Sequence, residues 1–377
     1  MVEHVLFLGT KSYPDVVTLT QTIENYGGEI NAYTDYHFTT YVIDCPKENT
    51  KNCLDILIEM VTQPLMPNDL DNEKEIVFEE IASQYNNSTR KLINFGISKV
   101  FKDKKCASFY TKPTGGNPKQ IDAITLRDVK KFYKKYYNQF VIFVHSSITE
   151  KSLRGLVNAN SNLKNITVKK SIFDHLENQC NTTNITKLSN KLPNKLPKLF
   201  EYTHNSPKDC VVLFYPTVNI FDDIRYCQKI ILNAMSEMMS SYWQVELREK
   251  TGLVYSVASG EFIMPFGGCM FFIFKTRSKN MEKLLEVVMK KLTLDCYLNE
   301  ALYKKHLESA INYTKGNILI DNEDKDHYLD NLIEDIAYET NITHILEKKS
   351  KTQIMKDVYK FVHLYMNPGN CNIIICR

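Results

Sequence analysis

The chain has 377 residues, of which 43% are hydrophobic and 24% are charged, and its formal net charge is +3. This length predicts two domains, or two fused halves, that can bury a sizeable core. The small net charge gives no reason to expect a nucleic acid or a membrane surface as partner, and no apolar run reaches the roughly 18 residues of a transmembrane helix.

The ten cysteines include no Cys-x-x-Cys pair, and several lie in apolar stretches. This usage predicts reduced core thiols in an intracellular, cytoplasmic protein, and no signal or transit peptide precedes the first motif. No cysteine lies in a recognisable nucleophile context, so a cysteine-dependent enzyme has little support.

Hydrophobic periodicity predicts mostly helices and one hairpin in the first half. A short helix ends near Gly9, and a second ends at Gly27-Gly28. The hairpin covers 29–45, with a turn near Asp35. Further helices are predicted at 49–61, at 68–85, from there to 101 as a second helix, and at 125–137. A strand is predicted at 140–145.

A stretch rich in Asn, Thr, Lys and Pro, residues 178–198, predicts a linker between a first half at 1–177 and a second half at 199–377. The second half is predicted to begin with a buried strand and to continue with a long helix, a strand pair around Gly267-Gly268 and further helices. The predicted strand and long helix cover 210–215 and 222–250.

The two halves share an ending. The sequence Asp128-Val129-Lys130-Lys131-Phe132 is matched by Asp357-Val358-Tyr359-Lys360-Phe361, and two further identities follow at the same offset of 229 residues. Each copy is a predicted helix that leads into an apolar strand, which indicates an internal duplication. The first half is about 30 residues shorter, so we expect it to lack a strand, a loop and the start of a helix at its front.

Glu3 and His4 occupy the last two positions of an H-x-x-E-H pattern whose first His would precede Met1. On a helix, residues i and i+4 share a face, so two such His can bind one zinc ion, and a Glu at i+3 can accept a proton from water. Taken alone, an ordinary exposed Glu-His pair is the simpler explanation.

Four stretches together resemble the pitrilysin, insulin-degrading-enzyme and mitochondrial-processing-peptidase family of zinc metallopeptidases. The resemblance covers essentially the whole chain and implies an α/β fold of two homologous halves. Each half would be a mixed or antiparallel sheet with helices packed on it, and together they would form a clam-shell chamber. The four stretches are Glu3-His4 with Leu6-Phe7-Leu8-Gly9-Thr10 and Tyr13-Pro14, Gly27-Gly28-Glu29-Ile30-Asn31-Ala32-Tyr33-Thr34, Pro64-Leu65 with Glu73 to Ile81, and Leu247-Arg248-Glu249-Lys250-Thr251-Gly252-Leu253-Val254-Tyr255-Ser256.

The resemblance implies that Glu3 is the general base and that His4 and Glu80 are zinc ligands. Register favours Glu80 over Glu79, because neighbouring helical residues point about 100° apart. Glu73 lies two turns before Glu80, roughly 10 Å away along the helix, which suits a role in supporting the ligands rather than binding the metal. Without the upstream motif, this acidic stretch would be interpreted as an exposed helix face.

The resemblance also implies substrate contacts. Asn31 and Ala32 would lie on a strand edge that pairs with extended peptide. Arg248 and Tyr255 would donate hydrogen bonds to the substrate and to the tetrahedral intermediate. The alternatives are a simple turn at Asn31, a surface arginine and a core tyrosine.

The resulting hypothesis is a Zn²⁺-dependent metalloendopeptidase that cleaves unfolded peptides, without nucleic-acid or membrane partners and with homo- or heterodimerisation left open. The alternative is an inactive homologue that binds peptide or a partner subunit, because a catalytic zinc needs three protein ligands and the chain supplies only His4 and Glu80. Three explanations remain open: a true start upstream, a natural truncation, or the Met1 amine as third ligand.

Overall fold

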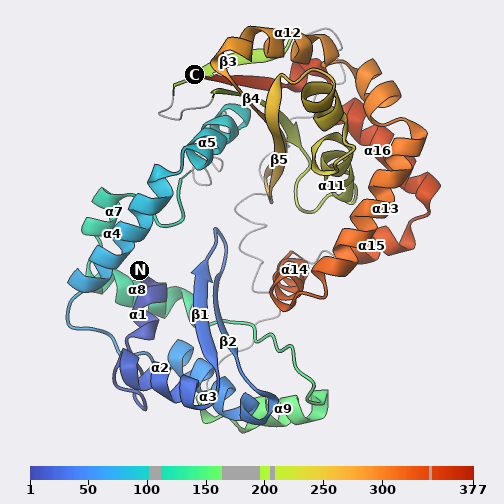
Figure 1. Ribbon diagram of the computed structural model, residues 1–377. Helices are drawn as coiled ribbons and strands as arrows, with labels where there is room; N and C mark the ends of the chain where they lie inside the picture. Colours follow the sequence, from blue (N-terminus) through green and yellow to red (C-terminus); the bar gives the residue numbers. More distant parts are fainter. Residues whose placement is uncertain (102–111, 164–195, 204–208, 339–341) are drawn as a thin grey trace. The chain divides into compact units, whose positions relative to one another are not determined.

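The computed structural model describes residues 1–101, 112–163, 196–203, 209–338 and 342–377 (Figure 1). The fold is mixed α/β and divides into two compact units. The first comprises residues 1–87 and 112–172, and the second comprises 88–111 and 173–377.

The first unit contains the predicted hairpin. Strands β1 (Glu29–Thr34) and β2 (Thr39–Asp44) are antiparallel, with Ala32 opposite Tyr41. A helix leads into them and ends at Gly27, whose φ of +69° is the left-handed conformation that glycine adopts without strain. These features confirm the predicted helix end and hairpin.

Helices make up most of the rest of this unit, and apolar side chains from several of them form its core. The central cluster comprises Leu6, Leu19, Ile23, Ile56 and Met60, all almost fully buried. The helices are α1 (Val2–Phe7), α2 (Val16–Asn25), α3 (Thr50–Thr62), α4 (Asp71–Asn86), α7 (Pro118–Asp122), α8 (Leu126–Tyr136) and α9 (Glu150–Ala159).

The predicted strand at 140–145 is wrong: the structure assigns no strand there, and none of the described strands pairs with this segment. Among the described residues of the first unit, only β1 and β2 form a sheet. A strand exists only when a neighbour accepts its backbone hydrogen bonds, and no described strand lies in register with this segment. The apolar pattern was therefore not sufficient to predict a strand.

The second unit is built on a five-stranded sheet of order β3-β7-β4-β6-β5. The pair β3–β7 is parallel, and the other neighbours are antiparallel. The predicted strands at the start, around Gly267-Gly268 and at the end are confirmed. Their bounds are β3 (Lys198–Tyr202), β4 (Asp209–Thr217), β5 (Val254–Met264), β6 (Gly267–Thr276) and β7 (Asn372–Cys376).

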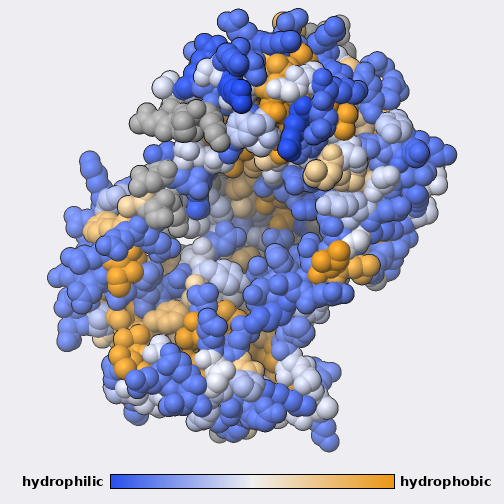
Figure 2. All heavy atoms as spheres, in the orientation of Figure 1, coloured by the Kyte–Doolittle hydropathy of each residue, from blue (hydrophilic) through white to orange (hydrophobic). Residues whose placement is uncertain are grey.

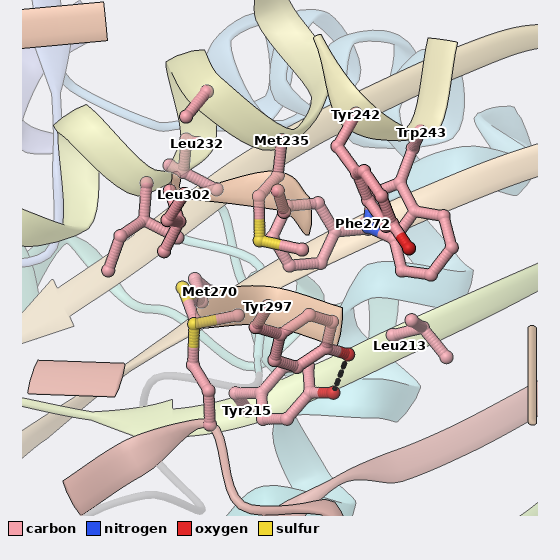
Figure 3. Packing of buried hydrophobic residues seen from close by; sticks show 14 of the residues in the cluster. Leu213, Tyr215, Leu232, Met235, Tyr242, Trp243, Met270, Phe272, Tyr297 and Leu302 are labelled. Carbon is pink, nitrogen blue, oxygen red and sulfur yellow. Dashed lines mark hydrogen bonds between the residues drawn. The ribbon is translucent and has the colours of Figure 1, made fainter. Parts of the chain in front are cut away.

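Helices pack against this sheet around one large core. In that core the hydroxyls of Tyr215 and Tyr297 are hydrogen-bonded at 2.7 Å, and Trp243 and Phe272 lie nearby (Figure 3). The helices of this unit are α5 (Ser88–Val100), α11 (Tyr226–Leu232), α12 (Met281–Lys291), α13 (Lys304–Asp321), α14 (Lys325–Ala337), α15 (Ile342–Lys348) and α16 (Lys351–Tyr365).

The single long helix predicted at 222–250 is interrupted. Helix α11 continues into a π-helix, η3 (Asn233–Glu237), and the chain turns extended at Met238, with ψ of 146°. A second π-helix, η4 (Gln244–Glu249), follows, and the turn after it contains Gly252, whose φ is +60°. A π-helix has more residues per turn than an α-helix, so the side chains of η3 and η4 point in other directions than they would on one continuous α-helix.

Helix α5 follows α4 directly in sequence yet packs in the second unit. An added Cβ at Gly96 would lie 2.1 Å from the Phe214 ring of β4, so only glycine allows this close approach. Nearby, the rings of Phe95 and Tyr202 lie 4.9 Å apart. Helix α5, from the predicted first half, therefore belongs to the second compact unit, and most of the predicted linker at 178–198 lies outside the described residues.

The face of the molecule seen in Figure 2 is largely hydrophilic, with hydrophobic residues in separate patches. Leu319 and Ile320, at the end of α13, are among the most exposed apolar side chains. Of the helices described, none combines the length and the apolar character needed to cross a bilayer. The eight described cysteines are all free thiols, and most are buried, in line with the predicted reduced core thiols.

Candidate metal centre

Helices α1 and α4 bring His4, Glu73 and Glu80 together in the first unit. The Nε2 atom of His4 lies 3.5 Å from Glu80 Oε2, and its Nδ1 atom lies 3.5 Å from Glu73 Oε2. The imidazole therefore has one carboxylate at each ring nitrogen. Two residues about 70 positions away in sequence thus meet at a single side chain.

The sequence of α4 explains this placement. Glu73 lies on the same helix face as Val77 and Ile81, and all three are buried. Glu80 lies two turns after Glu73, about 20° around the helix on the side away from Val77 and Ile81, and 56% of its side chain is exposed, against 11% for Glu73. A carboxylate within an apolar stripe is unusual, so this pattern was a signal for a role of Glu73 that the sequence already contained.

The pair His4 Nε2 and Glu80 Oε2 has the right spacing for one zinc ion. Nitrogen and oxygen ligands at about 2.0–2.2 Å from a tetrahedral zinc lie about 3.4 Å from each other. The 3.5 Å observed matches that span. Glu73 faces the other ring nitrogen, the position from which a carboxylate orients a metal-binding histidine.

The donor set is incomplete among the described residues. They contain no group of three or more His, Cys, Asp or Glu side chains that could hold a metal ion. His4 and Glu80 supply two donors, while a catalytic zinc site needs three protein ligands. Of the carboxylates on α4, Glu73 and Glu80 form described ion pairs with His4, and Glu79 forms none; the choice of Glu80 over Glu79 as ligand stays a prediction.

The Met1 amine is buried beside the same carboxylates. Burial lowers the pKa of this amine, while the negative charges of Glu3, Glu80 and Glu73 act in the opposite direction. The idea of Met1 as a third donor stays a prediction.

The predicted base, Glu3, is held by a residue that sequence reasoning did not single out. The Thr34 hydroxyl, at the end of β1, donates a hydrogen bond to Glu3 Oε2. This contact joins α1 to the strand that carries Asn31 and Ala32, and it leaves Oε1 of Glu3 as the second acceptor. Thr34 lies on the same strand face as Ala32, so the alternation of side chains along the strand could have indicated that Thr34 belongs to the site.

Asn31 and Ala32 lie in the middle of β1, as predicted. Asn31 Oδ1 accepts a hydrogen bond of 2.8 Å from the backbone N–H of Ala32. The only described neighbour of β1 is β2, so the other edge of β1 has no described strand beside it. That edge has the geometry for strand addition, although substrate pairing there stays a prediction.

Arg248 and Tyr255 both belong to the second unit and lie on either side of the turn at Gly252. The carbonyl of Arg248 accepts the N–H of Gly252 at 3.0 Å, which closes π-helix η4. Tyr255 is 40% exposed and sits where the register between β5 and β6 shifts. Such an irregularity re-aims a side chain out of the regular strand pattern. The alternative of a core tyrosine is therefore wrong.

The helix that carries Arg248 is anchored by a charged cluster that the sequence did not reveal. Lys291 Nζ lies 2.9 Å from Glu246 and 3.2 Å from Glu300. Glu246 also pairs with Lys250. Burial alone would raise the pKa of Glu246, but hydrogen bonds from Lys250 and Lys291 lower it below its usual value.

Two family profiles match the chain. Residues 1–114 match the profile described as "Insulinase (Peptidase family M16)". Residues 123–307 match the profile described as "Peptidase M16 inactive domain". Together they account for most of the chain and include the residues at His4 and Glu80.

Curated relatives carry zinc-protease names. An uncharacterized zinc protease of Streptomyces coelicolor is 23% identical over 72% of this chain and 56% of its own length. The uncharacterized zinc protease YmxG of Bacillus subtilis is 22% identical over 84% of this chain and 72% of its own length. Nardilysin of Rattus norvegicus is 27% identical over 51% of this chain, and the matched part covers only 17% of nardilysin.

Solved structures show the same fold. The peptidase M16 inactive domain from Pseudomonas fluorescens superposes with a TM-score of 0.72 at 16% identity, covering all of this chain and 86% of that one. The first half of the periplasmic protease PqqL from Escherichia coli gives a TM-score of 0.73 at 17% identity, covering all of this chain and 81% of that one. With these profiles, relatives and structures in agreement, the chain belongs to the insulinase (M16) peptidase family.

Proposed function

We propose that this protein is a zinc-dependent metalloendopeptidase that acts on unfolded peptides. The observation that carries the proposal is the imidazole of His4, which has Glu80 at one nitrogen and Glu73 at the other, each at 3.5 Å. A ligand histidine in a zinc site has this environment: a second ligand beside the coordinating nitrogen and a carboxylate that fixes the ring from behind.

In this proposal His4 Nε2 and Glu80 would hold the zinc, together with a third donor that the described residues do not supply. When bound, the ion would polarise a substrate carbonyl and acidify a water molecule. Glu73 would keep the proton on His4 Nδ1, so that Nε2 is the free donor atom.

Glu3 would accept a proton from the attacking water at Oε1, while Thr34 holds Oε2 in place. The open edge of β1 would pair with the backbone of an extended peptide at Asn31 and Ala32, which selects unfolded chains over folded ones. Arg248 and Tyr255 would donate hydrogen bonds to the substrate backbone and to the developing oxyanion.

Zinc content and cleavage of a quenched fluorescent peptide test the proposal together. We expect one zinc per chain and chelator-sensitive cleavage. Glu3→Gln should retain the zinc and lose at least about 100-fold in rate, the usual contribution of a general base. Glu80→Gln should lose zinc, and Glu73→Gln should weaken zinc affinity by about 10- to 100-fold.

Glu79→Gln is the matched control, because it removes one carboxylate from the adjacent position of the same helix without touching His4. It should leave zinc content and rate unchanged. Protein that stays zinc-free at saturating zinc, or cleavage that survives Glu3→Gln, would contradict the proposal.

A second candidate function is a non-catalytic peptide-binding homologue. The observation that favours it is the two-donor site, since the described residues lack a third ligand. It predicts that the zinc-free protein still binds an extended peptide and that Glu3→Gln binds it equally well, with no cleavage in either case.

A further inference from the structure

Two cysteines lie directly opposite one another on neighbouring strands of the second unit. Cys210, the second residue of β4, is the register partner of Cys376, the last residue of β7. Partners in an antiparallel pair have Cα atoms about 4.5–5.5 Å apart and point their side chains to one face of the sheet. A disulfide needs Cα atoms about 4.4–6.8 Å apart. The backbone therefore already holds these two thiols at the spacing of a disulfide.

A lysine forms a row with the two thiols. Lys275 of β6 is the register partner of Cys210 on the other side, so Cys376, Cys210 and Lys275 follow one another across β7, β4 and β6. Partners in register share a face of the sheet, and this is the face on which Gly96 of α5 meets Phe214. Cys210 therefore has a second thiol on one side and a cationic side chain on the other.

The row affects the two thiols in opposite ways. A hydrogen bond from Cys376, together with the charge of Lys275, lowers the pKa of Cys210 below its usual value, against the effect of burial. The same hydrogen bond and burial raise the pKa of Cys376. Cys210 is therefore the thiol that ionises first. A thiolate is the nucleophilic form of cysteine, and a second thiol beside it can resolve its oxidised product.

Two other buried cysteines of the same unit lack this arrangement. Burial raises the pKa of Cys269, and it raises the pKa of Cys371 to about 12. The strand partners of Cys269 are Pro216 and Phe262, so no thiol lies opposite it in the sheet. Buried structural cysteines of this kind are inert. The pair of Cys210 and Cys376 differs from them in both geometry and ionisation.

Access to the pair depends on its place at the ends of two strands. Cys210 is 4% exposed and Cys376 is fully buried. However, β4 begins one residue before Cys210, and β7 ends at Cys376, next to the C-terminus marked in Figure 1. Their sequence neighbours are more open: Asp209 is partly exposed and Arg377 is exposed. Strand ends open at a lower free-energy cost than strand middles, so a small oxidant is favoured over a bulky one.

We propose that Cys210 and Cys376 form a reversible disulfide when the protein meets hydrogen peroxide, and that this bond fastens β7 to β4. The Cys210 thiolate attacks one peroxide oxygen, the O–O bond breaks, and a sulfenic acid forms while hydroxide leaves with the proton that Cys210 released. The Cys376 sulfur then attacks the Cys210 sulfur, the S–S bond forms, and the S–O bond breaks. The departing hydroxide takes the Cys376 proton, so two thiols are oxidised and the peroxide is reduced to two water molecules.

The bond would close a loop of about 165 residues within the second unit, and a long loop is where a cross-link restricts the unfolded chain most. A reducing thiol would reopen it by exchange. This inference is independent of the proposed peptidase activity, because it involves none of the residues of the candidate metal centre.

Mass spectrometry of the full chain after brief treatment with hydrogen peroxide tests the proposal. After free thiols are alkylated and the protein is digested, we expect two peptides joined through Cys210 and Cys376, which dithiothreitol separates. In thermal unfolding, the oxidised wild type should melt about 10 °C higher than the reduced wild type, because the cross-link restricts the unfolded chain.

Cys269→Ala is the matched control for Cys376→Ala, because each removes one fully buried thiol from a strand of the same sheet. Cys376→Ala should lose both the joined peptides and the rise in melting temperature on oxidation. Cys269→Ala should keep both. Melting of each variant in its reduced form confirms that folded proteins are compared.

The wild-type digest decides the question even where a variant fails to fold. Alkylated, unjoined Cys210 and Cys376 after peroxide treatment would overturn the proposal. A sulfinic acid on Cys210 without the joined peptides, or peptides that join only in urea-unfolded protein, would also overturn it. A rise in melting temperature that survives Cys376→Ala would assign the effect to other cysteines.

Discussion

The two copies of the repeated helix-strand segment share a sequence pattern but not an environment. In the second unit, α16 leads into β7, which lies between β3 and β4 and is buried along its whole length. In the first unit, α8 leads into 140–145, which pairs with no described strand. Nearly the same local pattern therefore ends in a central strand in one unit and, in the other, in a segment that belongs to none of the described strands.

The aromatic pair of the repeat shows the same contrast. Phe361 and Tyr365 have ring centroids 4.8 Å apart, and Phe132 and Tyr136 have centroids 4.6 Å apart, so helix geometry reproduces the pair. Phe361 is fully buried, whereas Phe132 is 49% exposed. The comparison teaches that a repeated motif sets local geometry, while burial depends on what the surrounding unit places over it.

Hydrogen exchange should give the largest difference between the copies. Amides of β7 should exchange only through global unfolding of their unit, at a cost of about 5–15 kcal/mol, because they bond to strands on both sides. Amides of 140–144, which pair with none of the described strands, should exchange much faster than those of β7. Mass-spectrometric exchange on peptides from both segments measures this. Comparable protection in the two segments would show that 140–145 is paired after all.

Removal of the aromatic side chain should give the next largest difference. Phe361→Ala should cost about 3–5 kcal/mol, since it opens a cavity in the core. Phe132→Ala should change stability by no more than about 0.5 kcal/mol. Urea unfolding measures both: the fluorescence of the single Trp, Trp243, follows the second unit, and far-UV circular dichroism follows the helices of both units, so a comparison of the two signals isolates the first. Equal costs would contradict the difference in burial.

The aspartate of the repeat should give the smallest difference, and its effect should depend on pH. Burial alone would raise the pKa of Asp357, but hydrogen bonds from Lys349, Tyr226 and Gln353 together hold it below its usual value. Asp357→Asn should therefore cost about 2 kcal/mol at neutral pH, because it leaves Lys349 without its anionic partner. Unfolding experiments on wild type and variant, across pH, measure this cost.

The direction of the pH dependence of stability follows from the lowered pKa of Asp357. Asp357 is ionised more readily in the folded protein than in the unfolded chain, so its contribution is present above the unfolded pKa of about 4. That contribution is lost as pH falls through the folded pKa, and the stabilities of wild type and variant should converge there. Asp128, which caps α8 at the surface with Thr125, is the comparison site. A pH-independent difference for Asp357 would contradict the charge-based explanation.

Much of the candidate site was predictable because its signals are local. The period of α4 places Glu73 and Glu80 on one face two turns apart, and the short spacing of Glu3 and His4 places both on α1. The hairpin at 29–45 follows from its residue types, and the helix before it ends at a glycine pair. These features depend on backbone geometry over a few residues, which the residues themselves dictate.

Long-range contacts could not be predicted in the same way. The Thr34 contact to Glu3, the Lys291 contact to Glu246 and the close approach of Gly96 to Phe214 each join residues that are distant in sequence. No periodicity encodes such a pair, because it depends on how whole elements pack. The interruption of the 222–250 helix and the missing strand at 140–145 have the same origin.

The sequence by itself determined the family pattern, the duplication and the residue types that a zinc site would use. Only the tertiary structure decided that His4 lies between Glu73 and Glu80 and that Phe361 is core while Phe132 is surface. The physical reason is that helix and turn preferences act between near neighbours, whereas burial and strand pairing depend on partners that only the folded chain brings together.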